Sequence, residues 1–209
     1  MYIPKKLQME SQQQIHDFID EFGFAVLTTS NLTASHLPLL LKREEGELGT
    51  LYGHLAKANS HWKSMDCEPI LAVFSGPHGY ISPTWYDSFP AVPTWNYAAV
   101  HIKGEVSLTD EETTLQVLTD TIDKYESGLL SPLNNSASEH GFIPAEYKAK
   151  LSKAIIGFKI SITSIEGKLK LGQHRTTADQ LGVIAGLNQS TRLDDQALLA
   201  YTKRHTEVD

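Results

Sequence analysis

Residues 53–62, with the sequence GHLAKANSHW, mark the point at which a predicted strand gives way to a predicted helix. The apolar run 48–52 before them is typical of a strand, and Ser60–Met65 is predicted to form a short helix. The free N–H groups and the dipole of a helix start attract anions, Lys57 adds a full positive charge, and Asn59 is a favoured N-cap residue. The stretch is therefore a candidate phosphate cradle, and the alternative is an ordinary loop with a solvated lysine.

The segments on either side predict strands joined by short turns, with helices at the margins. The expected strands lie at 24–29, 33–41, 48–54, 70–75, 80–82, 96–108, 158–162 and 168–173, with turns at Gly76-Pro77 and Glu166-Gly167. The expected helices lie at 12–22, 111–126, 177–187 and 194–204, and another begins at Pro144 after a loop over 127–142. Thr109 with Glu112 is the expected cap of the second helix, and Pro38 indicates an edge or a bulge. Because alternating βαβ units are absent, the pattern predicts an α+β fold with an antiparallel β-barrel or a strongly coiled sheet.

The composition is that of an ordinary globular protein with one domain, or one domain and an appendage. The chain has 209 residues, of which 41% are hydrophobic and 21% charged. The lone cysteine, Cys67, cannot form an internal disulfide, which suits a reducing cytoplasm. The polar segment 8–14 stands where a signal peptide needs an apolar core, and no apolar run approaches the roughly twenty residues of a membrane span. We therefore expect a cytoplasmic protein that does not span a membrane.

The charge of the chain argues against nucleic acid as a direct partner. The formal net charge is −7 and the pI is about 5.7, whereas affinity for nucleic acid comes largely from neutralising phosphates. The basic clusters at 148–153 and 168–175 are small, and we interpret them as solvated faces. No helix-turn-helix pattern is evident either.

Several longer motifs occur along the chain in one order. They are MYIP at 1–4, SHLPLLL at 35–41, LYGHLA at 51–56, FSGPHGYISP at 74–83 and VPTWNY at 92–97. On these motifs the chain resembles the PaiB family of FMN-binding proteins, usually labelled negative transcriptional regulators, and the resemblance extends to about Gly186. It implies an α+β fold of the FMN-binding type, an antiparallel split β-barrel with peripheral helices. It also implies a homodimer that holds the flavin near the subunit interface.

The resemblance continues into a late motif with one departure. The family usually reads Ser-Gln-Asn-Arg there, and residues 172–175 read GQHR, so Gln173 and Arg175 are retained while His174 replaces the asparagine. The planar guanidinium of Arg175 suits an oxyanion such as a phosphate, and a surface arginine is the alternative. We expect an FMN-binding split-barrel domain over 1–176 and a helical extension over 177–209.

FMN, the cofactor that the resemblance implies, makes three demands on a binding site. Its dianionic phosphate needs cationic and N–H donors, its ribityl chain needs polar partners, and its flat ring needs an apolar slot with backbone groups along the polar edge. In similar split barrels the flavin lies against the second and third strands, with the phosphate ligands after the third. The predicted cofactor-binding residues are His36, Leu37, Pro38, His54, Leu55, Lys57, Asn59, Gln173 and Arg175.

Other residue patterns bear on a metal site, on catalysis and on the walls of the flavin pocket. Four histidines recur on successive strand regions: His36, His54, His78 and His101. They lack the short ligand spacing of a zinc site, so no metal is predicted. No nucleophile elbow is present and no side chain identifies itself as a general acid or base, so the catalytic residues are unassigned. Trp85 and Trp95 in the aromatic loop either wall the flavin pocket or serve as core and interface aromatics.

Three hypotheses of function follow. The first is an FMN-binding regulatory protein that acts indirectly, because no DNA-binding motif is evident. The second is a small FMN-dependent oxidoreductase with a nicotinamide donor, since similar split barrels often oxidise or reduce small molecules. The third is a flavin-free barrel that acts through its dimer surface.

Overall fold

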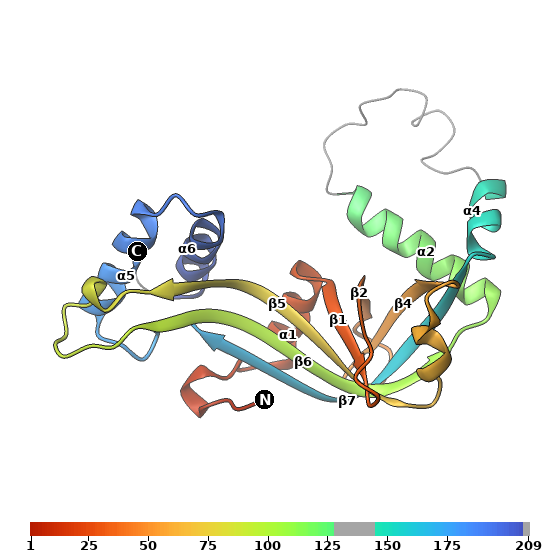
Figure 1. Cartoon of the computed structure of the whole chain (residues 1–209), viewed down its shortest axis with the longest axis horizontal. Helices are drawn as coiled ribbons and strands as arrows, with labels where there is room; N and C mark the ends of the chain where they lie inside the picture. The colour runs from red at the N-terminus through yellow and green to blue at the C-terminus, as the bar shows by residue number, and fades with distance from the viewer. Residues whose placement is uncertain (128–144, 207–209) are drawn as a thin grey trace, which may run out of the picture. The chain divides into compact units, whose positions relative to one another are not determined.

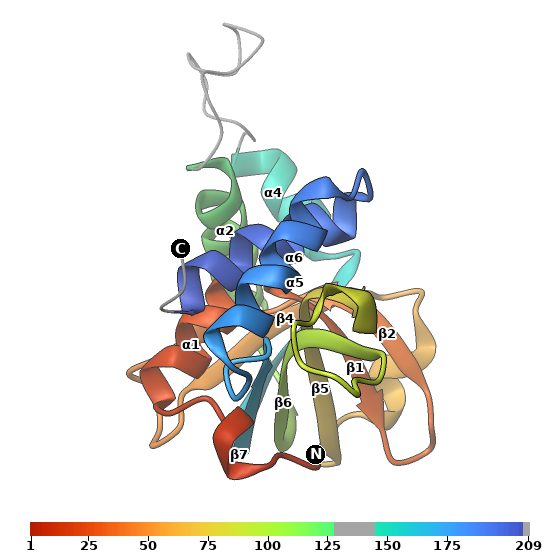
Figure 2. The ribbon, with the colours of Figure 1, turned by 90° about the vertical axis from the view of Figure 1, so that its left-hand side faces the viewer.

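The computed structural model describes residues 1–127 and 145–206 (Figures 1 and 2). Its strands are β1 (Phe24–Thr29), β2 (Ala34–Pro38), β3 (Leu40–Lys42), β4 (Thr50–Ala56), β5 (Pro69–Ile81), β6 (Thr94–Leu108) and β7 (Ile155–Lys170). Its α-helices are α1 (Gln12–Glu21), α2 (Glu111–Glu126), α4 (Ala145–Ser152), α5 (Thr177–Gln189) and α6 (Leu193–His205). Short 3-10 helices lie at Lys5–Leu7 (η1), Ser60–Ser64 (η2) and Pro83–Trp85 (η3). None of the helices in these two ranges is long and apolar enough to cross a membrane.

The seven strands belong to one antiparallel sheet in the order β2-β1-β5-β6-β7-β4-β3. With helices at its margins this sheet confirms the predicted α+β class. The chain divides into two compact units, and β5, β6 and β7 contribute residues to both. The first unit comprises 1–22, 74–101 and 166–209, and the second comprises 23–73 and 102–165.

The second unit is built on two strand ladders. β1 and β2 form a hairpin in which Phe24 faces Pro38 and Thr28 faces Ala34. β4 pairs with β7 over its whole length, and the pairing ends with Ala56 opposite Ile155. The side chains that fill the core of this unit include Leu27, Leu37, Leu39, Leu51, Leu55, Phe158 and Ile160.

Gly53 is required by the close packing of this core. A Cβ atom at Gly53 would lie 2.7 Å from the Leu39 side chain and 2.8 Å from the ring of Phe158. Any larger residue would therefore force two fully buried side chains apart. Gly53, the first residue of GHLAKANSHW, thus allows β4 to pack in the core. The loop at 57–59 follows the end of β4 at Ala56.

The N-cap of α2 lies one residue later than predicted, whereas the helix itself begins at Glu111 as expected. The sequence favours Thr109 with Glu112, whereas in the structure the Asp110 carboxylate accepts a hydrogen bond of 2.7 Å from the Thr113 N–H. Thr109 instead exchanges a hydrogen bond of 2.9 Å with the hydroxyl of Thr114. A carboxylate satisfies the free N–H groups of the first turn and also interacts favourably with the helix dipole, which explains why Asp110 is the cap.

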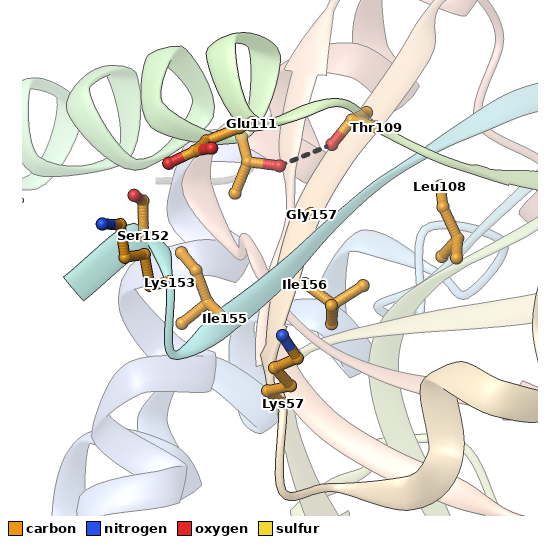
Figure 3. Close-up of a pocket in the computed structure, with 10 residues that line it drawn as sticks. Lys57, Leu108, Thr109, Glu111, Ser152, Lys153, Ile155, Ile156 and Gly157 are labelled. Carbon is orange, nitrogen blue, oxygen red and sulfur yellow. Dashed lines mark hydrogen bonds between the residues drawn. The ribbon is translucent and has the colours of Figure 1, made fainter. Parts of the chain in front are cut away.

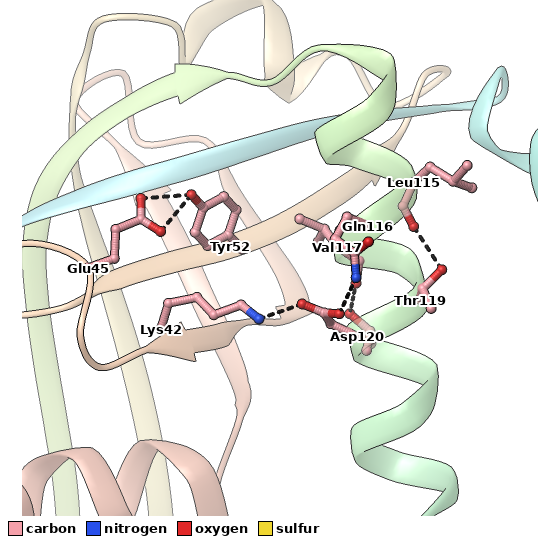
Figure 4. A network of polar contacts seen from close by, with 9 residues as sticks. Lys42, Glu45, Tyr52, Leu115, Gln116, Val117, Thr119 and Asp120 are labelled. Carbon is pink, nitrogen blue, oxygen red and sulfur yellow. Dashed lines mark hydrogen bonds and ion pairs between the residues drawn. The ribbon is translucent and has the colours of Figure 1, made fainter.

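One ion pair joins α2 to β3, and a separate polar contact lies on β4, both within the second unit (Figure 4). Lys42 of β3 forms an ion pair with Asp120, which also accepts a hydrogen bond of 2.7 Å from Gln116. Burial raises the pKa of Asp120, but the hydrogen bonds from Lys42 and Gln116 outweigh it and leave the pKa below its ordinary value. On β4, the Tyr52 hydroxyl donates to both carboxylate oxygens of Glu45, and burial together with this carboxylate raises the pKa of Tyr52 to about 12.

In the first unit, α5 carries two glycines that accommodate Trp85. A Cβ atom at Gly182 or Gly186 would overlap the backbone or the ring of Trp85. Trp85 is therefore a packing residue of this unit, as one of the two predicted roles proposed. Trp95 is 50% exposed, and its ring lies 6.2 Å from that of Tyr80 in an edge-on arrangement.

Two predicted turns are wrong. The strands predicted at 70–75 and 80–82 are one strand, β5. Of the strand predicted at 168–173, residues 168–170 are the end of β7, and 171–173 lie beyond it. A Cβ atom at Gly76 would lie 2.8 Å from the ring of Phe18, and one at Gly167 would lie 2.5 Å from the sulfur of Met9. Both glycines therefore permit close packing inside a strand and do not turn the chain.

The remaining elements agree with prediction to within a few residues. The strand predicted over 33–41 is divided into β2 and β3 at Leu39, in keeping with the expected irregularity at Pro38. The loop predicted over 127–142 and the helix start at Pro144 lie outside the described residues, except for Ser127. The domain boundary at residue 176 stays a prediction.

Candidate functional site

The candidate site is an open pocket in the second unit (Figure 3). Its volume is about 440 Å³, within the range of roughly 300–1,000 Å³ that is usual for small-molecule sites. It is lined by Lys57, Leu108, Thr109, Glu111, Thr114, Ser152, Lys153, Ile155, Ile156 and Gly157, and we call it the Lys57 pocket. Of the predicted cofactor-binding residues, Lys57 alone is among these.

Strand pairing places Lys57 at the pocket. After β4 ends at Ala56, the Lys57 N–H donates to the carbonyl of Ala154 over 2.8 Å, just before β7 begins. The Lys57 side chain is exposed, and its ammonium group has no hydrogen bond or ion pair with any residue of the described ranges. A cation without a carboxylate partner is available to an anionic ligand.

The rest of the lining combines polar and apolar groups. Lys153 is a second exposed lysine, and the hydroxyls of Thr109 and Thr114 hydrogen-bond to each other there (Figure 3). Glu111 adds one carboxylate, so the cations are in excess in this pocket. The apolar part is formed by Leu108, Ile155 and Ile156. The donor set suits a phosphate with a polar chain, and the apolar side chains suit an uncharged ring system.

His54 lies opposite a pocket-lining residue on the β4–β7 ladder. It pairs with Gly157, and residues directly opposite each other on antiparallel strands share one face of the sheet. A Cβ atom at Gly157 would overlap the hydroxyls of Thr109 and Thr114, so only glycine lets α2 approach so closely here. Burial lowers the pKa of His54, which keeps its imidazole neutral near pH 7.

The loop after Lys57 is held mainly by its own groups. The predicted N-cap is confirmed, since the Asn59 side-chain oxygen accepts from the His61 N–H over 3.0 Å. The Trp62 indole donates to the Lys57 carbonyl over 3.0 Å. The N–H groups of Lys57 and Asn59 already donate to Ala154 and Ala56. The helix is a short 3-10 helix and these donors are engaged, so the Lys57 ammonium is the group of this loop that remains available to an anion.

The predicted residues on β2 and the adjacent part of β4 lie outside the pocket lining. Leu37 and Leu55 are 4% and 5% exposed, so only their backbone can reach a ligand, as the sequence hypothesis assumed. His36 is exposed, and its ring lies 6.4 Å from that of Phe24 on the neighbouring strand. Pro38 is half-buried at the end of β2. Their roles toward a cofactor stay predictions.

Gln173 belongs to the first unit and supports the local backbone there. Its amide group donates to the carbonyls of Leu169 and Lys6 over 2.6 and 3.2 Å, and its oxygen accepts from the Leu171 N–H over 2.9 Å. Both ends of the side chain are thus engaged within this unit. A ligand contact by Gln173 stays a prediction.

Arg175 also belongs to the first unit. Its guanidinium lies 4.3 Å above the ring of Tyr86 and 3.7 Å from the buried carboxylate of Asp179. Asp179 accepts a hydrogen bond of 2.9 Å from the Ser88 N–H, which is the main reason that its pKa lies below the ordinary value. Arg175 therefore balances a buried charge, and its predicted phosphate contact stays untested.

Neither unit shows a metal centre in the part of the chain that the structure describes. Within 1–127 and 145–206, no group of three or more His, Cys, Asp or Glu side chains is arranged to hold a metal ion.

Sequence reasoning missed most of the lining of the Lys57 pocket. Lys153 was assigned to a solvated basic face, and Thr109 was assigned only a capping role. A basic residue two positions before a β-branched strand start, Lys153 before Ile155, was an available signal. Its meaning depended on the pairing of β4 with β7, which brings together segments far apart in the chain.

Two solved structures of similar architecture are described by their names as flavin proteins. The flavocytochrome Anf3 from Azotobacter vinelandii matches 81% of this chain and 72% of its own with a TM-score of 0.55 at 19% identity. The FAD and heme binding protein from Mycobacterium smegmatis matches 78% of this chain and 73% of its own with a TM-score of 0.55 at 14% identity. At these identities the similarity shows the fold, and the predicted split-barrel class is confirmed.

The sequence comparisons define the family. The family model described as "Putative FMN-binding domain" matches residues 1–164, and the chain belongs to this family. Protease synthase and sporulation protein PAI 2 from Bacillus subtilis is 35% identical over 191 residues, which cover 90% of this chain and 89% of that protein. The resemblance to the PaiB family is confirmed, and so is the prediction of FMN as the cofactor.

Proposed function

We propose that this protein is an FMN-binding regulator of the PaiB type that acts indirectly, without a DNA-binding element of its own. The observation that carries the proposal is the ammonium of Lys57, which has no partner among residues 1–127 and 145–206 and lies in a pocket of suitable size, within a chain of the FMN-binding family. The phosphate of FMN is the natural partner for such a cation.

In this proposal different residues bind different parts of FMN. Lys57 holds the phosphate, with Lys153 and the threonine hydroxyls of the pocket nearby. His54 lies opposite a pocket-lining residue as a neutral group that can donate or accept a hydrogen bond. The exposed outer side of β2 around His36 and Pro38 offers backbone groups to the polar edge of the ring. When bound, FMN supplies one- or two-electron redox chemistry at its isoalloxazine ring.

The regulatory part of the proposal rests on PAI 2 and on charge. The name of that relative refers to protease synthesis and sporulation, and the two chains align over nearly their full lengths. The net charge of −7 supports an indirect route to gene control, because a direct repressor must neutralise DNA phosphates. We also propose that the protein is cytoplasmic and a homodimer.

The test of cofactor binding is an absorption spectrum of freshly purified protein, followed by mass identification of the released ligand. We expect a flavin spectrum and one FMN per chain. A correctly folded protein that neither retains nor takes up FMN would leave the flavin-free interaction module as the better description.

Two further assays separate the functional hypotheses. In an anisotropy titration with DNA at about 0.15 M salt, where charges are screened beyond about 8 Å, we expect weak or absent binding. Tight sequence-specific binding would contradict the indirect mode of action. Steady oxidation of NADH or NADPH by the FMN-loaded protein would favour the oxidoreductase over the regulator.

A further inference from the structure

A chain of buried hydrogen bonds lies behind the loop that carries Lys57. His61, the second residue of η2, is 2% exposed. Its Nδ1 lies 2.8 Å from the Ser35 hydroxyl on β2, and its Nε2 lies 3.0 Å from the Thr29 hydroxyl on β1. One imidazole therefore joins the loop to both strands of the β1–β2 hairpin.

The neighbours of these hydroxyls determine the direction of each hydrogen bond. The Thr29 hydroxyl donates to Asn31 Oδ1 over 2.7 Å, so it accepts a hydrogen bond from His61 Nε2–H. At the other end the Ser35 hydroxyl accepts from Asn59 Nδ2 over 3.2 Å, and its own proton is free to point at His61 Nδ1. The proton of a neutral His61 accordingly resides on Nε2.

The Asn59 side-chain amide connects these hydrogen bonds to the loop. Its oxygen accepts from the His61 N–H, and its nitrogen donates to Ser35, so both ends of the side chain are engaged in one orientation. A protonated His61 would place a second donor toward Ser35 and leave the serine proton without its acceptor. Burial lowers the pKa of His61, in agreement with a neutral ring.

We propose that His61, acting through Ser35 and Asn59, is the positioning residue that holds Lys57 in place for the phosphate of FMN. The identity of the ligand rests on the proposed function. The ordering of the loop by His61 rests on the hydrogen bonds alone. His61 touches no ligand in this account. Its imidazole sets the conformation of residues 57–61, because a buried polar side chain keeps its position only where its partners are satisfied.

The test uses three variants of the full-length protein and two measurements. His61→Leu removes both ring nitrogens, whereas His61→Gln keeps one acceptor and one donor in the same side chain. Ser60→Ala is the matched control, since Ser60 is exposed in the same turn. Urea unfolding of each variant at pH 7 first establishes that the proteins are folded.

The first measurement is amide hydrogen exchange of the flavin-free protein at Lys57, Asn59 and His61. These three N–H groups donate to Ala154, Ala56 and Asn59 Oδ1 in the structure. We expect faster exchange in His61→Leu, and exchange as in the wild type in His61→Gln and Ser60→Ala. Unchanged exchange in His61→Leu would overturn the positioning role, whether or not the protein binds flavin.

The second measurement compares the affinities for FMN and riboflavin, which differ only in the phosphate. We expect His61→Leu to weaken FMN binding by about tenfold, a typical consequence of losing one charge-assisted hydrogen bond, and to leave riboflavin binding unchanged. His61→Gln should restore the FMN affinity. Equal losses for both flavins, or no loss for FMN, would overturn the inference. If the wild type binds neither flavin, the proposed function fails, and the link from His61 to a phosphate fails with it.

Discussion

Substitution of Lys57 by alanine should weaken FMN binding by a predictable amount. Two unit charges about 4 Å apart attract by about 4 kcal/mol at an effective dielectric constant near 20. Lys57 is exposed and screened by water, so we expect the smaller loss of about 1–3 kcal/mol that is typical of a charge-assisted hydrogen bond. This corresponds to a rise in Kd of about 5- to 150-fold.

The assay is a fluorescence titration of flavin-free protein with FMN and, in parallel, with riboflavin. Riboflavin lacks the phosphate, so its Kd should change little in the Lys57→Ala variant. Lys63→Ala is the matched control, because this nearby lysine is also exposed but lies 5.8 Å from the ring of Trp62 and outside the pocket. Wild-type affinity for FMN in Lys57→Ala, or an equal loss in Lys63→Ala, would refute the assignment of the phosphate to Lys57.

Three further predictions follow from the packing, the titrating groups and the proposed dimer. Gly53→Ala should lower the free energy of unfolding by about 1–3 kcal/mol, because the new methyl group overlaps Leu39 and Phe158, and urea unfolding that matches the wild type would contradict this packing. Burial lowers the pKa of His54 and His61, so below about pH 6.5 the unfolded chain binds protons that the folded chain does not. Stability should therefore fall between pH 7 and pH 5, which the urea midpoint measures, and a midpoint that rises on acidification would oppose this. Excess FMN should reduce the extent to which the proposed homodimer dissociates on dilution, as followed by light scattering, because a ligand that binds only the dimer stabilises it. A monomer that holds FMN as tightly as the dimer would place the whole site in one chain.

Local patterns in the sequence predicted most of the helices and strands. The alternation over 96–108 became β6, and the helical spacing in 12–22 became α1, because each depends on neighbours a few residues away. Two errors arose at glycines. The local pattern predicts turns at Gly76 and Gly167, but both glycines lie inside long strands, where Phe18 and Met9 pack against their backbones.

Some residues of the candidate site could likewise be predicted from local sequence, and others could not. Lys57 and the Asn59 cap were predicted from ten consecutive residues, since a strand end, an N-cap and a nearby cation are features of local sequence. Lys153 and His61 were not predicted as functional residues. Lys153 reaches the pocket through the pairing of β4 with β7, and His61 is buried between hydroxyls of β1 and β2.

The amino-acid sequence alone was sufficient for the family, the cofactor and the order of secondary structure in this protein, because motifs, hydrophobic periodicity and caps are local properties. Contacts between residues that are distant in the chain determined the shape of the Lys57 pocket. They also determined which hydrogen-bond donors around the pocket are already paired. No local pattern records which strand lies next to β4, or which hydroxyl faces a buried imidazole, since those contacts form only when the whole sheet packs.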